Sequence, residues 1–186
     1  MSKTLERIGM IARWRPVHLG QAAVLRTLCQ RAEQVFIGIG SSNRYNLRNP
    51  FTLEETQEML RLALAGYSNY TLIPVPDLDD GPRWRLIVLD MFGSLDLFVS
   101  DNPYVTHLLE NDYFLLRPVD LLTPEDRIRV DGTQVRRAMA QGADWQRFVP
   151  APVAHYIESN GLDERFRREF GLQTLAMDTF VESQAS

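Results

Sequence analysis

The chain has 186 residues, of which 45% are hydrophobic, 24% charged and 10% aromatic, as in an ordinary globular protein of one domain. This length can bury a sizeable core without disulfides or structural metal, and the composition excludes disordered, collagen-like and disulfide-scaffold proteins. With 24 acidic and 20 basic residues, the net charge of -4 argues against general binding of nucleic acid.

The basic residues are unevenly divided, because Lys3 is the only lysine and the other 19 of the 20 are arginine. Codon usage in a GC-rich genome would explain this excess. The alternative is a local role, since the planar guanidinium binds phosphate or carboxylate through two parallel hydrogen bonds. Some arginines would then lie beside a bound anion.

The cysteine usage and the apolar runs indicate the compartment. Cys29 is the only cysteine and falls in an apolar helical pattern, so we expect a buried structural residue in a reducing compartment rather than a nucleophile. No run approaches the roughly 18 apolar residues of a membrane span, and residues 1–7 lack the apolar core of a signal peptide. We therefore expect a cytoplasmic protein that binds no membrane.

Strand and helix patterns alternate over the first two thirds of the chain. Short apolar runs predict strands at residues 8–12, 35–40, 71–75, 95–100 and 113–116. Apolar spacing and capping signals predict helices at about 20–32, 52–64, 84–92 and 102–110, with Thr52 and Glu55 at capping-box spacing. This alternation predicts an α/β fold with an open parallel sheet of about five strands flanked by helices.

After Pro118 the strand patterns stop and helices follow. These are predicted at 131–141, from 150–152 to 161, and at about 163–170, and the last dozen residues look loosely held. We predict a single domain over residues 1–186, with a core of about 6–160 and a helical C-terminal segment and tail at 161–186.

Two predicted helix starts could bind phosphate, because ligands of an open parallel sheet bind beyond the carboxyl ends of its strands. His18 lies just before one helix, where the free amides and the helix dipole favour an anion. Its alternative role is to cap or pack at the helix start. Gly132 and Thr133 begin a second helix with Arg136 and Arg137 in its first turns, for which a solvated face is the alternative. Two such helix starts would suit a triphosphate.

Residues 13–21, Arg-Trp-Arg-Pro-Val-His-Leu-Gly-Gln, resemble the phosphate-binding HxGH loop of the nucleotidyltransferase superfamily. Their context is similar to the archaeal-type nicotinamide-nucleotide adenylyltransferases. Further segments resemble that family in the family's own order, at residues 37–42, 49–52, 73–77, 100–103, 132–137 and 144–150. The resemblance rests on this ordered set, which covers about residues 8–157, rather than on residues 13–21 or 132–137 alone.

The resemblance implies a Rossmann-like fold and an enzyme that joins nicotinamide mononucleotide to the adenylyl group of ATP. The products would be NAD and pyrophosphate, with Mg²⁺ as the cofactor and no metal ligand assigned to the protein. Such an in-line reaction needs positioning and stabilisation of phosphate charge rather than a covalent protein intermediate. Members of the family often form multimers, so we expect a homo-oligomer.

The resemblance also assigns residues to roles. His18 and Arg136 would be catalytic, because they would stabilise charge on the phosphates. The residues expected to bind ATP and its phosphates are Arg13, Arg15, Gly20, Gln21, Gly132, Thr133 and Arg137. The mononucleotide would be bound by Trp84, Asp77 and Asn102, with Trp84 stacked on the nicotinamide ring. The alternatives are a core or interface tryptophan at Trp84 and a turn-forming aspartate at Asp77.

The phosphate site departs from the family pattern at two main positions. Gln21 replaces the second histidine of HxGH, and Thr56 replaces an arginine that usually follows the glutamate at Glu55. A charge-assisted hydrogen bond contributes about 1.5 to 3 kcal/mol and a neutral one about 1, so Gln21 is expected to slow turnover between a few-fold and a few tens-fold. Arg15, which stands where glutamine is usual, or Arg44 could restore the positive charge.

The sequence leaves two other functions open. The same transfer could use nicotinate mononucleotide or another phosphorylated acceptor. The chain could instead be a nucleotide-binding or regulatory protein that has lost catalysis through Gln21 and Thr56.

Overall fold

The computed structural model describes residues 5–177, and these form two compact units, each built from separate stretches of sequence. Unit 1 takes the described residues within 5–13, 23–44 and 64–128. Unit 2 takes those within 14–22, 45–63 and 129–177. The last nine residues of the predicted C-terminal tail, 178–186, lie outside the described residues.

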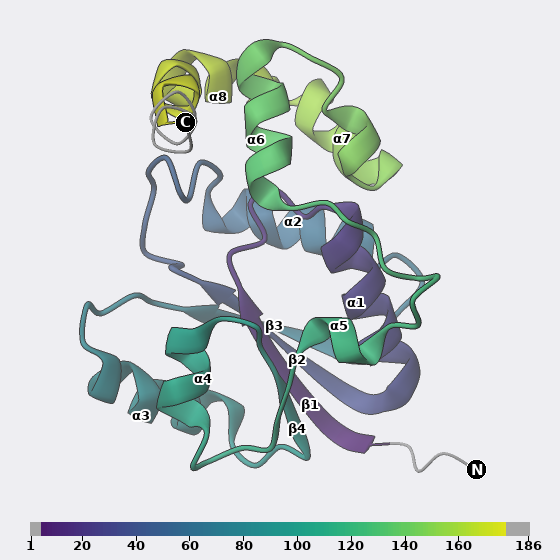
Figure 1. Ribbon diagram of the computed structural model, residues 1–186, viewed down its shortest axis with the longest axis vertical. Coiled ribbons are helices and arrows are strands. Elements are labelled where there is room, and N and C mark those ends of the chain that lie inside the picture. The colour runs from purple at the N-terminus through teal and green to yellow at the C-terminus, as the bar shows by residue number, and fades with distance from the viewer. Residues whose placement is uncertain (1–4, 178–186) are drawn as a thin grey trace, which may run out of the picture. The chain divides into compact units, whose positions relative to one another are not determined.

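Unit 1 contains a parallel sheet of five strands in the order β3-β2-β1-β4-β5 (Figure 1). The strands are β1 Leu5–Ala12, β2 Ala32–Gly40, β3 Tyr70–Val75, β4 Leu97–Val99 and β5 Leu115–Leu116. The order reverses at β1, which pairs with β2 on one side and β4 on the other, as in Rossmann-like folds. The predicted open parallel sheet with five strands is therefore confirmed.

The last two strands are shorter than predicted. The prediction for β4 began at residue 95, but the carboxylate of Asp96 accepts hydrogen bonds from the Glu6 and Arg7 amides at 2.7 and 3.0 Å. Asp96 therefore binds the beginning of β1 before β4 starts. In the run predicted for the last strand, Tyr113 turns its ring into the core and only two residues pair with β4.

The helices that belong to unit 1 are α3 Gly81–Phe92, α4 Pro103–Leu109 and α5 Pro118–Leu121, and α1 Leu19–Arg31 takes residues from both units. Helix α3 begins three residues before the predicted start, because Asp80 caps it by accepting a hydrogen bond from the Arg83 amide and Pro82 fits its first turn. Helix α5 was not predicted. None of the helices within residues 5–177 is long and apolar enough to cross a membrane.

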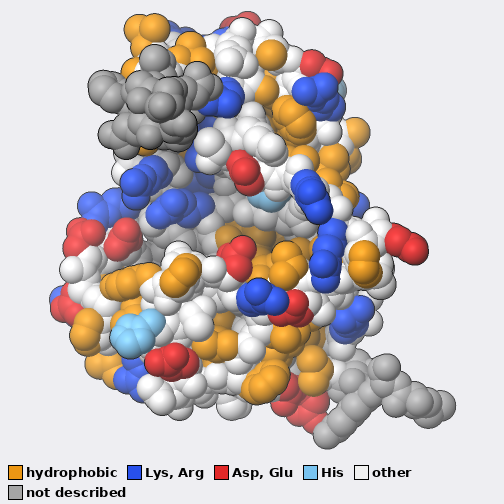
Figure 2. All heavy atoms as spheres, viewed as in Figure 1, with side chains coloured by type: hydrophobic (Ala, Val, Ile, Leu, Met, Phe, Trp, Pro, Cys, Tyr) orange, Lys and Arg blue, Asp and Glu red, His pale blue; other side chains and the backbone are white. Residues whose placement is uncertain are grey.

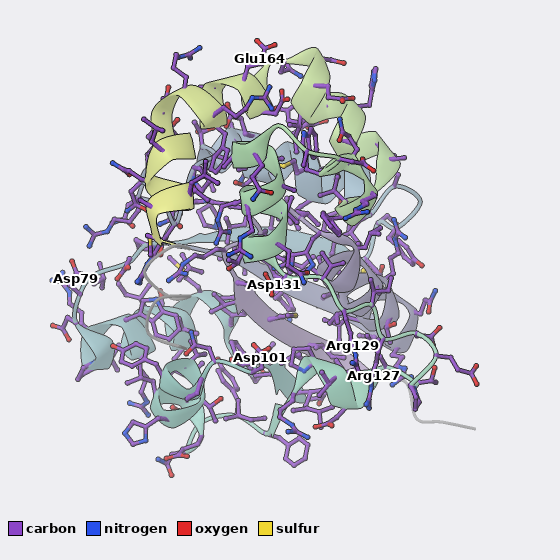
Figure 3. The ribbon with its side chains drawn as sticks, turned by 45° about the horizontal axis from the view of Figure 1, so that its top comes forward. Asp79, Asp101, Arg127, Arg129, Asp131 and Glu164 are labelled. Carbon is purple, nitrogen blue, oxygen red and sulfur yellow. The ribbon has the colours of Figure 1, made fainter. Side chains whose placement is uncertain are left out.

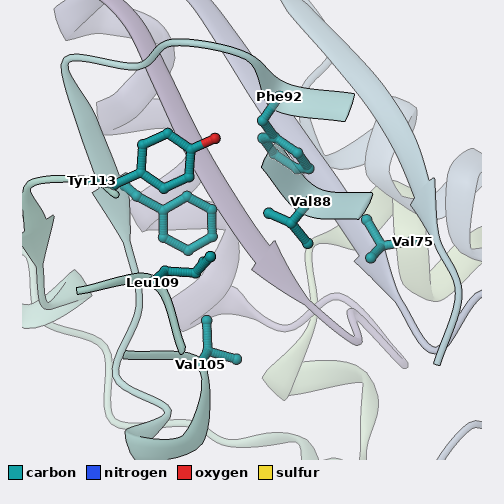
Figure 4. Packing of buried hydrophobic residues seen from close by; sticks show 7 residues of the cluster. Val75, Val88, Phe92, Val105, Leu109 and Tyr113 are labelled. Carbon is teal, nitrogen blue, oxygen red and sulfur yellow. The ribbon is translucent and has the colours of Figure 1, made fainter. Parts of the chain in front are cut away.

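One core cluster of unit 1 is formed by residues of β3, β4, α3, α4 and the segment before β5 (Figure 4). The rings of Phe98 and Tyr113 are stacked with centroids 5.5 Å apart, and Phe92 meets Phe98 edge-on at 6.1 Å. A Cβ atom on Gly38 would lie 2.9 Å from Cζ of Phe92, so glycine is required where the ring approaches β2. Aromatic packing therefore positions the two helices on the sheet.

Cys29 lies in α1 and is buried, as predicted. Burial raises the pKa of its thiol to about 11, so the unreactive thiol predominates at neutral pH.

Unit 2 is helical. Its elements are α2 Leu53–Ala63, α6 Gly132–Gln141, the 3₁₀ turn η1 Gln146–Phe148, α7 Ala151–Ser159, α8 Leu162–Phe166 and the π-helix η2 Arg167–Gly171. Helix α2 packs against α7, and α6 packs against α8 and η2. The capping box at Thr52 is confirmed, because Thr52 Oγ1 accepts from the Glu55 amide at 3.2 Å and Glu55 Oε2 accepts from the Thr52 amide at 2.9 Å.

Candidate phosphate-binding site

His18 caps helix α1 through its own ring. The amide of Gln21 donates to His18 Nδ1 at 3.3 Å, and the Gln21 side-chain oxygen accepts from the His18 amide at 3.4 Å. This reciprocal pair has the form of a capping box in which the imidazole takes the place of a serine or threonine hydroxyl. Because Nδ1 accepts a hydrogen bond, the proton of the neutral ring lies on Nε2.

The charge state of His18 is set by its surroundings. The residue is 9% exposed, and its pKa is lowered to about 4, mainly by burial; the charge of Asp131 opposes the shift and that of Arg136 adds to it. The imidazole is therefore neutral at pH 7. It is held as an Nε2–H donor, which is the form that can donate to a phosphate oxygen.

The start of α6 is also capped. The Asp131 carboxylate accepts from the Gln134 amide at 2.9 Å, and the Gln134 side chain accepts from the Asp131 amide at 3.1 Å. Figure 3 shows Asp131 at this end of the helix. The capping box does not use the amides of Gly132 and Thr133, which belong to the first turn and suit an anion.

Arg136 reaches back across the start of its own helix. One terminal nitrogen, Nη1, donates to the Arg15 carbonyl at 3.2 Å. A Cβ atom on Gly132 would lie 2.9 Å from that nitrogen, so a glycine here lets the guanidinium pass. Gly132 thus has a steric role that the sequence motif does not reveal by itself.

Arg15 is 2% exposed, and its Nε donates to Thr56 Oγ1 at 3.3 Å. Thr56 is fully buried, and its hydroxyl donates in turn to the Thr52 carbonyl at 2.7 Å. Arg15 and Thr56, which both differ from the residues usual in the family, therefore contact each other. This contact joins the loop before His18 to the first turns of α2.

Unit 2 thus brings together most of the residues predicted to bind phosphate. The loop before α1 and its first turn carry Arg15, His18, Gly20 and Gln21, and α6 carries Gly132, Thr133, Arg136 and Arg137. The electrostatic effect of Arg136 and Asp131 on His18 links the two helix starts. Unit 2 therefore contains neutral hydrogen-bond donors and guanidinium groups close to the N-termini of α1 and α6.

The residues predicted to bind the mononucleotide all belong to unit 1. Asp77 organises the loops after β2 and β3: its carboxylate accepts from Ser41 Oγ at 3.4 Å and from the Asp79 amide at 3.2 Å, while its amide donates to the Asn43 side chain at 2.8 Å. These contacts match the turn-forming alternative for Asp77. They leave its predicted contact with the mononucleotide untested.

Trp84 and Asn102 also have structural contacts in unit 1. Trp84 is half-buried in α3 and packs partly against the aromatic core cluster, while the Asn102 side chain caps α4 by accepting from the Tyr104 amide at 3.0 Å. Arg13 is exposed directly after β1, and Arg44 forms an ion pair with Asp79. Of the two arginines considered as replacements for lost charge, Arg15 is the one in the unit that holds His18.

Two residues that contact or influence the predicted site residues were not themselves predicted as site residues. Asp131 was expected only to open a helix, although its spacing to Gln134 is itself the signature of a capping box. Thr56 was noted only as a missing arginine, and its contact with Arg15 joins residues 41 positions apart. Asp131 could have been found from local spacing, but Thr56 could not.

Within residues 5–177 the structure contains no group of three or more histidine, cysteine, aspartate or glutamate side chains placed to hold a metal ion. Magnesium commonly binds through one or two carboxylates, several waters and the phosphates of a substrate.

Comparison with known proteins matches residues 13–138 to a family described as cytidylyltransferase-like. The chain belongs to this cytidylyltransferase-like family. The nicotinamide-nucleotide adenylyltransferase of Methanolobus tindarius is 32% identical over 157 residues, which span 83% of this chain and 88% of that protein. The enzyme of the same description from Methanococcus vannielii is 30% identical over 153 residues, or 81% of this chain and 87% of that protein.

The fold of this family member is also that of a larger solved protein. A bifunctional NMN adenylyltransferase/ADP ribose pyrophosphatase from Francisella tularensis superposes with a TM-score of 0.69 at 15% sequence identity. The match covers 96% of this chain and 56% of that one. It confirms the Rossmann-like fold, and at this identity it supports the fold alone.

Proposed function

We propose that this chain joins ATP and nicotinamide mononucleotide to form NAD and pyrophosphate. A 5′-phosphate oxygen of the mononucleotide attacks the α-phosphorus of ATP in line with the leaving group, and the bond between the α-phosphorus and the bridging oxygen breaks as pyrophosphate departs. No bond to the protein forms. The protein contributes by positioning the two nucleotides and stabilising the charge on the phosphates.

His18 donates from Nε2–H to a phosphate oxygen of ATP. His18 Nδ1 accepts a hydrogen bond from the main-chain amide of Gln21, and this bond orients the ring. Because the pKa of His18 is lowered to about 4, the residue acts as a neutral donor at pH 7 and needs no proton exchange during the reaction. The positive charge is then left to arginines.

Arg136 and Arg15 supply that charge. They are joined through the Arg15 carbonyl, which accepts from Arg136, so one ordered loop places both guanidinium groups. The first-turn amides of Gly132 and Thr133 add neutral donors at the start of α6. Arg13, Gly20, Gln21 and Arg137 are proposed to complete the ATP site.

The remaining assignments follow the family. Trp84, Asp77 and Asn102 are proposed to bind the mononucleotide. Mg²⁺ would arrive on the phosphates of ATP, where it neutralises part of their charge. Cytoplasmic location, homo-oligomeric assembly and the absence of nucleic-acid and membrane partners stay predictions from the sequence.

The observation that carries the proposal is the pairing of a neutral, Nε2-protonated His18 with Arg136 at two helix starts, in a relative of archaeal nicotinamide-nucleotide adenylyltransferases. The test is release of pyrophosphate from ATP and Mg²⁺ with a panel of mononucleotides. We expect release, with formation of NAD, when nicotinamide mononucleotide is the acceptor.

Two results would contradict the proposal. Faster turnover with nicotinate mononucleotide or another phosphorylated acceptor would assign the transfer to that substrate. Clear binding of ATP without pyrophosphate release from any acceptor would assign the chain to nucleotide binding alone. An Arg136→Gln variant is the matched control, because it removes the charge beside His18 and should abolish most of the release.

A further inference from the structure

The hydroxyl of Thr56 makes two hydrogen bonds inside unit 2. It donates to the Thr52 carbonyl at 2.7 Å, one turn back in its own helix, and it accepts from Arg15 Nε at 3.3 Å. The first bond fixes the direction of the hydroxyl proton, so a lone pair is left to face Arg15. A fully buried threonine thus presents an oriented acceptor to a buried cation.

The contact at Nε has a consequence for the rest of the Arg15 side chain. The guanidinium group is planar, so a partner on Nε restricts the plane in which both terminal nitrogens lie. Arg15 also holds Arg136 through its main-chain carbonyl at 3.2 Å. Arg15 therefore contacts both Thr56, through its side chain, and Arg136, through its main chain.

We infer that Thr56 is a positioning residue for the reaction: it sets the plane of the Arg15 guanidinium, and through it the binding of the ATP phosphates. This inference rests on the proposed function. Thr56 itself touches no substrate in this scheme. It acts from the first turns of α2, whose amino-terminal end is fixed by the Thr52–Glu55 capping box.

The experiment compares Thr56→Val with Thr56→Ser. Valine keeps the branched shape but removes the acceptor, whereas serine keeps the hydroxyl and loses only a methyl group. Since a hydrogen bond to a charged group is among the stronger ones, we expect Thr56→Val to raise the KM and the Kd for ATP roughly tenfold. The KM for the mononucleotide should change less than twofold, and Thr56→Ser should retain the parent KM for ATP.

Thr174→Val is the matched control. Thr174 is also a buried helical threonine of unit 2, and its hydroxyl donates to the Phe170 carbonyl at 2.9 Å, again one turn back. Its substitution removes the same kind of bond away from Arg15. We expect a change in melting temperature and an unchanged KM for ATP.

A double-mutant cycle separates positioning from general stability. Arg15→Gln should raise the KM for ATP, and Thr56→Val should add almost nothing in that background because the group it positions is gone. A normal KM for ATP in folded Thr56→Val, or the same loss in both backgrounds, would overturn the inference. If Thr56→Val does not fold, Thr56→Ala removes the same hydroxyl without added bulk and carries the same expectations.

The Kd for ATP keeps this test separate from that of the proposed function. If the parent protein binds ATP but releases no pyrophosphate, the proposed function fails. The Thr56→Val comparison by calorimetry still decides whether Thr56 positions Arg15: a tenfold weaker Kd supports the inference and an unchanged Kd overturns it.

Discussion

His18 combines burial with a place at a helix start, and the two together determine its chemistry. A histidine in water has a pKa of about 6.5 and is partly charged at neutral pH. Here burial lowers the pKa to about 4, and the Gln21 amide occupies Nδ1. The residue is therefore a fixed neutral donor, and in the proposed function Arg15 and Arg136 carry the charge that a second histidine would share.

This charge state predicts how stability depends on pH. The unfolded chain has the ordinary pKa of 6.5 and the folded protein one of about 4, so the unfolded chain binds more protons between these values. The stability that depends on neutral His18 is complete above pH 6.5 and is lost as the pH falls toward 4. At about 1.4 kcal/mol per pKa unit, the full loss is about 3 kcal/mol.

We expect His18→Asn to flatten this dependence. The asparagine oxygen can replace Nδ1 as the cap acceptor but does not titrate. Between pH 7 and pH 4.5 the parent protein should lose about 2 to 3 kcal/mol more unfolding free energy than the variant, as measured by urea denaturation. Carboxylates titrate in both proteins, so the difference isolates His18. Equal slopes for the parent and for His18→Asn would refute the assignment of the low pKa to His18.

The sequence identified candidate residues for this site but not the interactions between them. His18, Arg136 and Arg15 stand at positions that the motif order identifies. The neutral state of His18 depends on burial, and the bond between Arg15 and Thr56 depends on packing between segments 41 residues apart. Neither has a periodic or local signature, so neither could be predicted from spacing.

At the scale of elements, one ion pair joins the start of α2 to α8. Arg165 donates from both terminal nitrogens to the Glu55 carboxylate at 2.6 and 2.7 Å, and one of them also donates to the Pro50 carbonyl at 3.3 Å. Burial alone would raise the pKa of Glu55, but the hydrogen bonds from Arg165 and the Thr52 amide, with the charge of Arg165, lower it overall. The stability from this pair is therefore present above pH 4.5 and is lost as the pH falls below it.

We expect Arg165→Met to destabilise unit 2, because methionine keeps an apolar stem but leaves Glu55 without its cation. The side chains of Arg165 and Glu55 are 22% and 15% exposed, so the loss should approach that of a buried pair, about 2 to 4 kcal/mol in urea denaturation at pH 7. Arg61→Met is the control. It breaks an exposed pair with Glu58 at 3.4 Å and should cost no more than about 0.5 kcal/mol. Similar losses from both substitutions would show that the pair has no special role.

The predicted elements agree with the structure where a local signal sets them. The capping box at Thr52, the first-turn proline after Asn102 and the helix start expected at Asp131 placed the starts of α2, α4 and α6 correctly. The bounds of β4 and β5 depend on tertiary contacts of Asp96 and Tyr113, and the predicted helix at 163–170 changes into a π-helix at Arg167. These features are set by packing partners that lie far away in the sequence.

At the scale of the whole molecule, the net charge of -4 gives no attraction for ATP. Arg side chains are interspersed with Asp and Glu on the face drawn in Figure 2. At physiological salt, charges more than about 8 Å apart are largely screened. Binding of a triphosphate therefore depends on the guanidinium groups beside it and not on the sign of the total charge, so the arginine excess is informative only at Arg15, Arg136 and their neighbours.

The parts of unit 2 lie far apart along the chain. Unit 2 takes three separate stretches, and its C-terminal stretch supplies Arg136 to the Arg15 carbonyl, Arg165 to Glu55, and α7 to the face of α2. A fragment of residues 1–128 keeps all five strands but lacks these partners. The face of α2 that packs against α7 would then lose its cover.

We expect this fragment to bind a hydrophobic dye, to aggregate and to show no ATP-dependent rise in melting temperature. Co-expression of residues 1–128 with residues 129–186 is the control, since every segment is present and only the peptide bond in the exposed stretch before Val130 is missing. The two pieces should purify together, and saturation with ATP at about 100 times the Kd should stabilise the pair by about 2.7 kcal/mol. A monomeric fragment 1–128 that binds no dye would show instead that the first two stretches of unit 2 fold without the third.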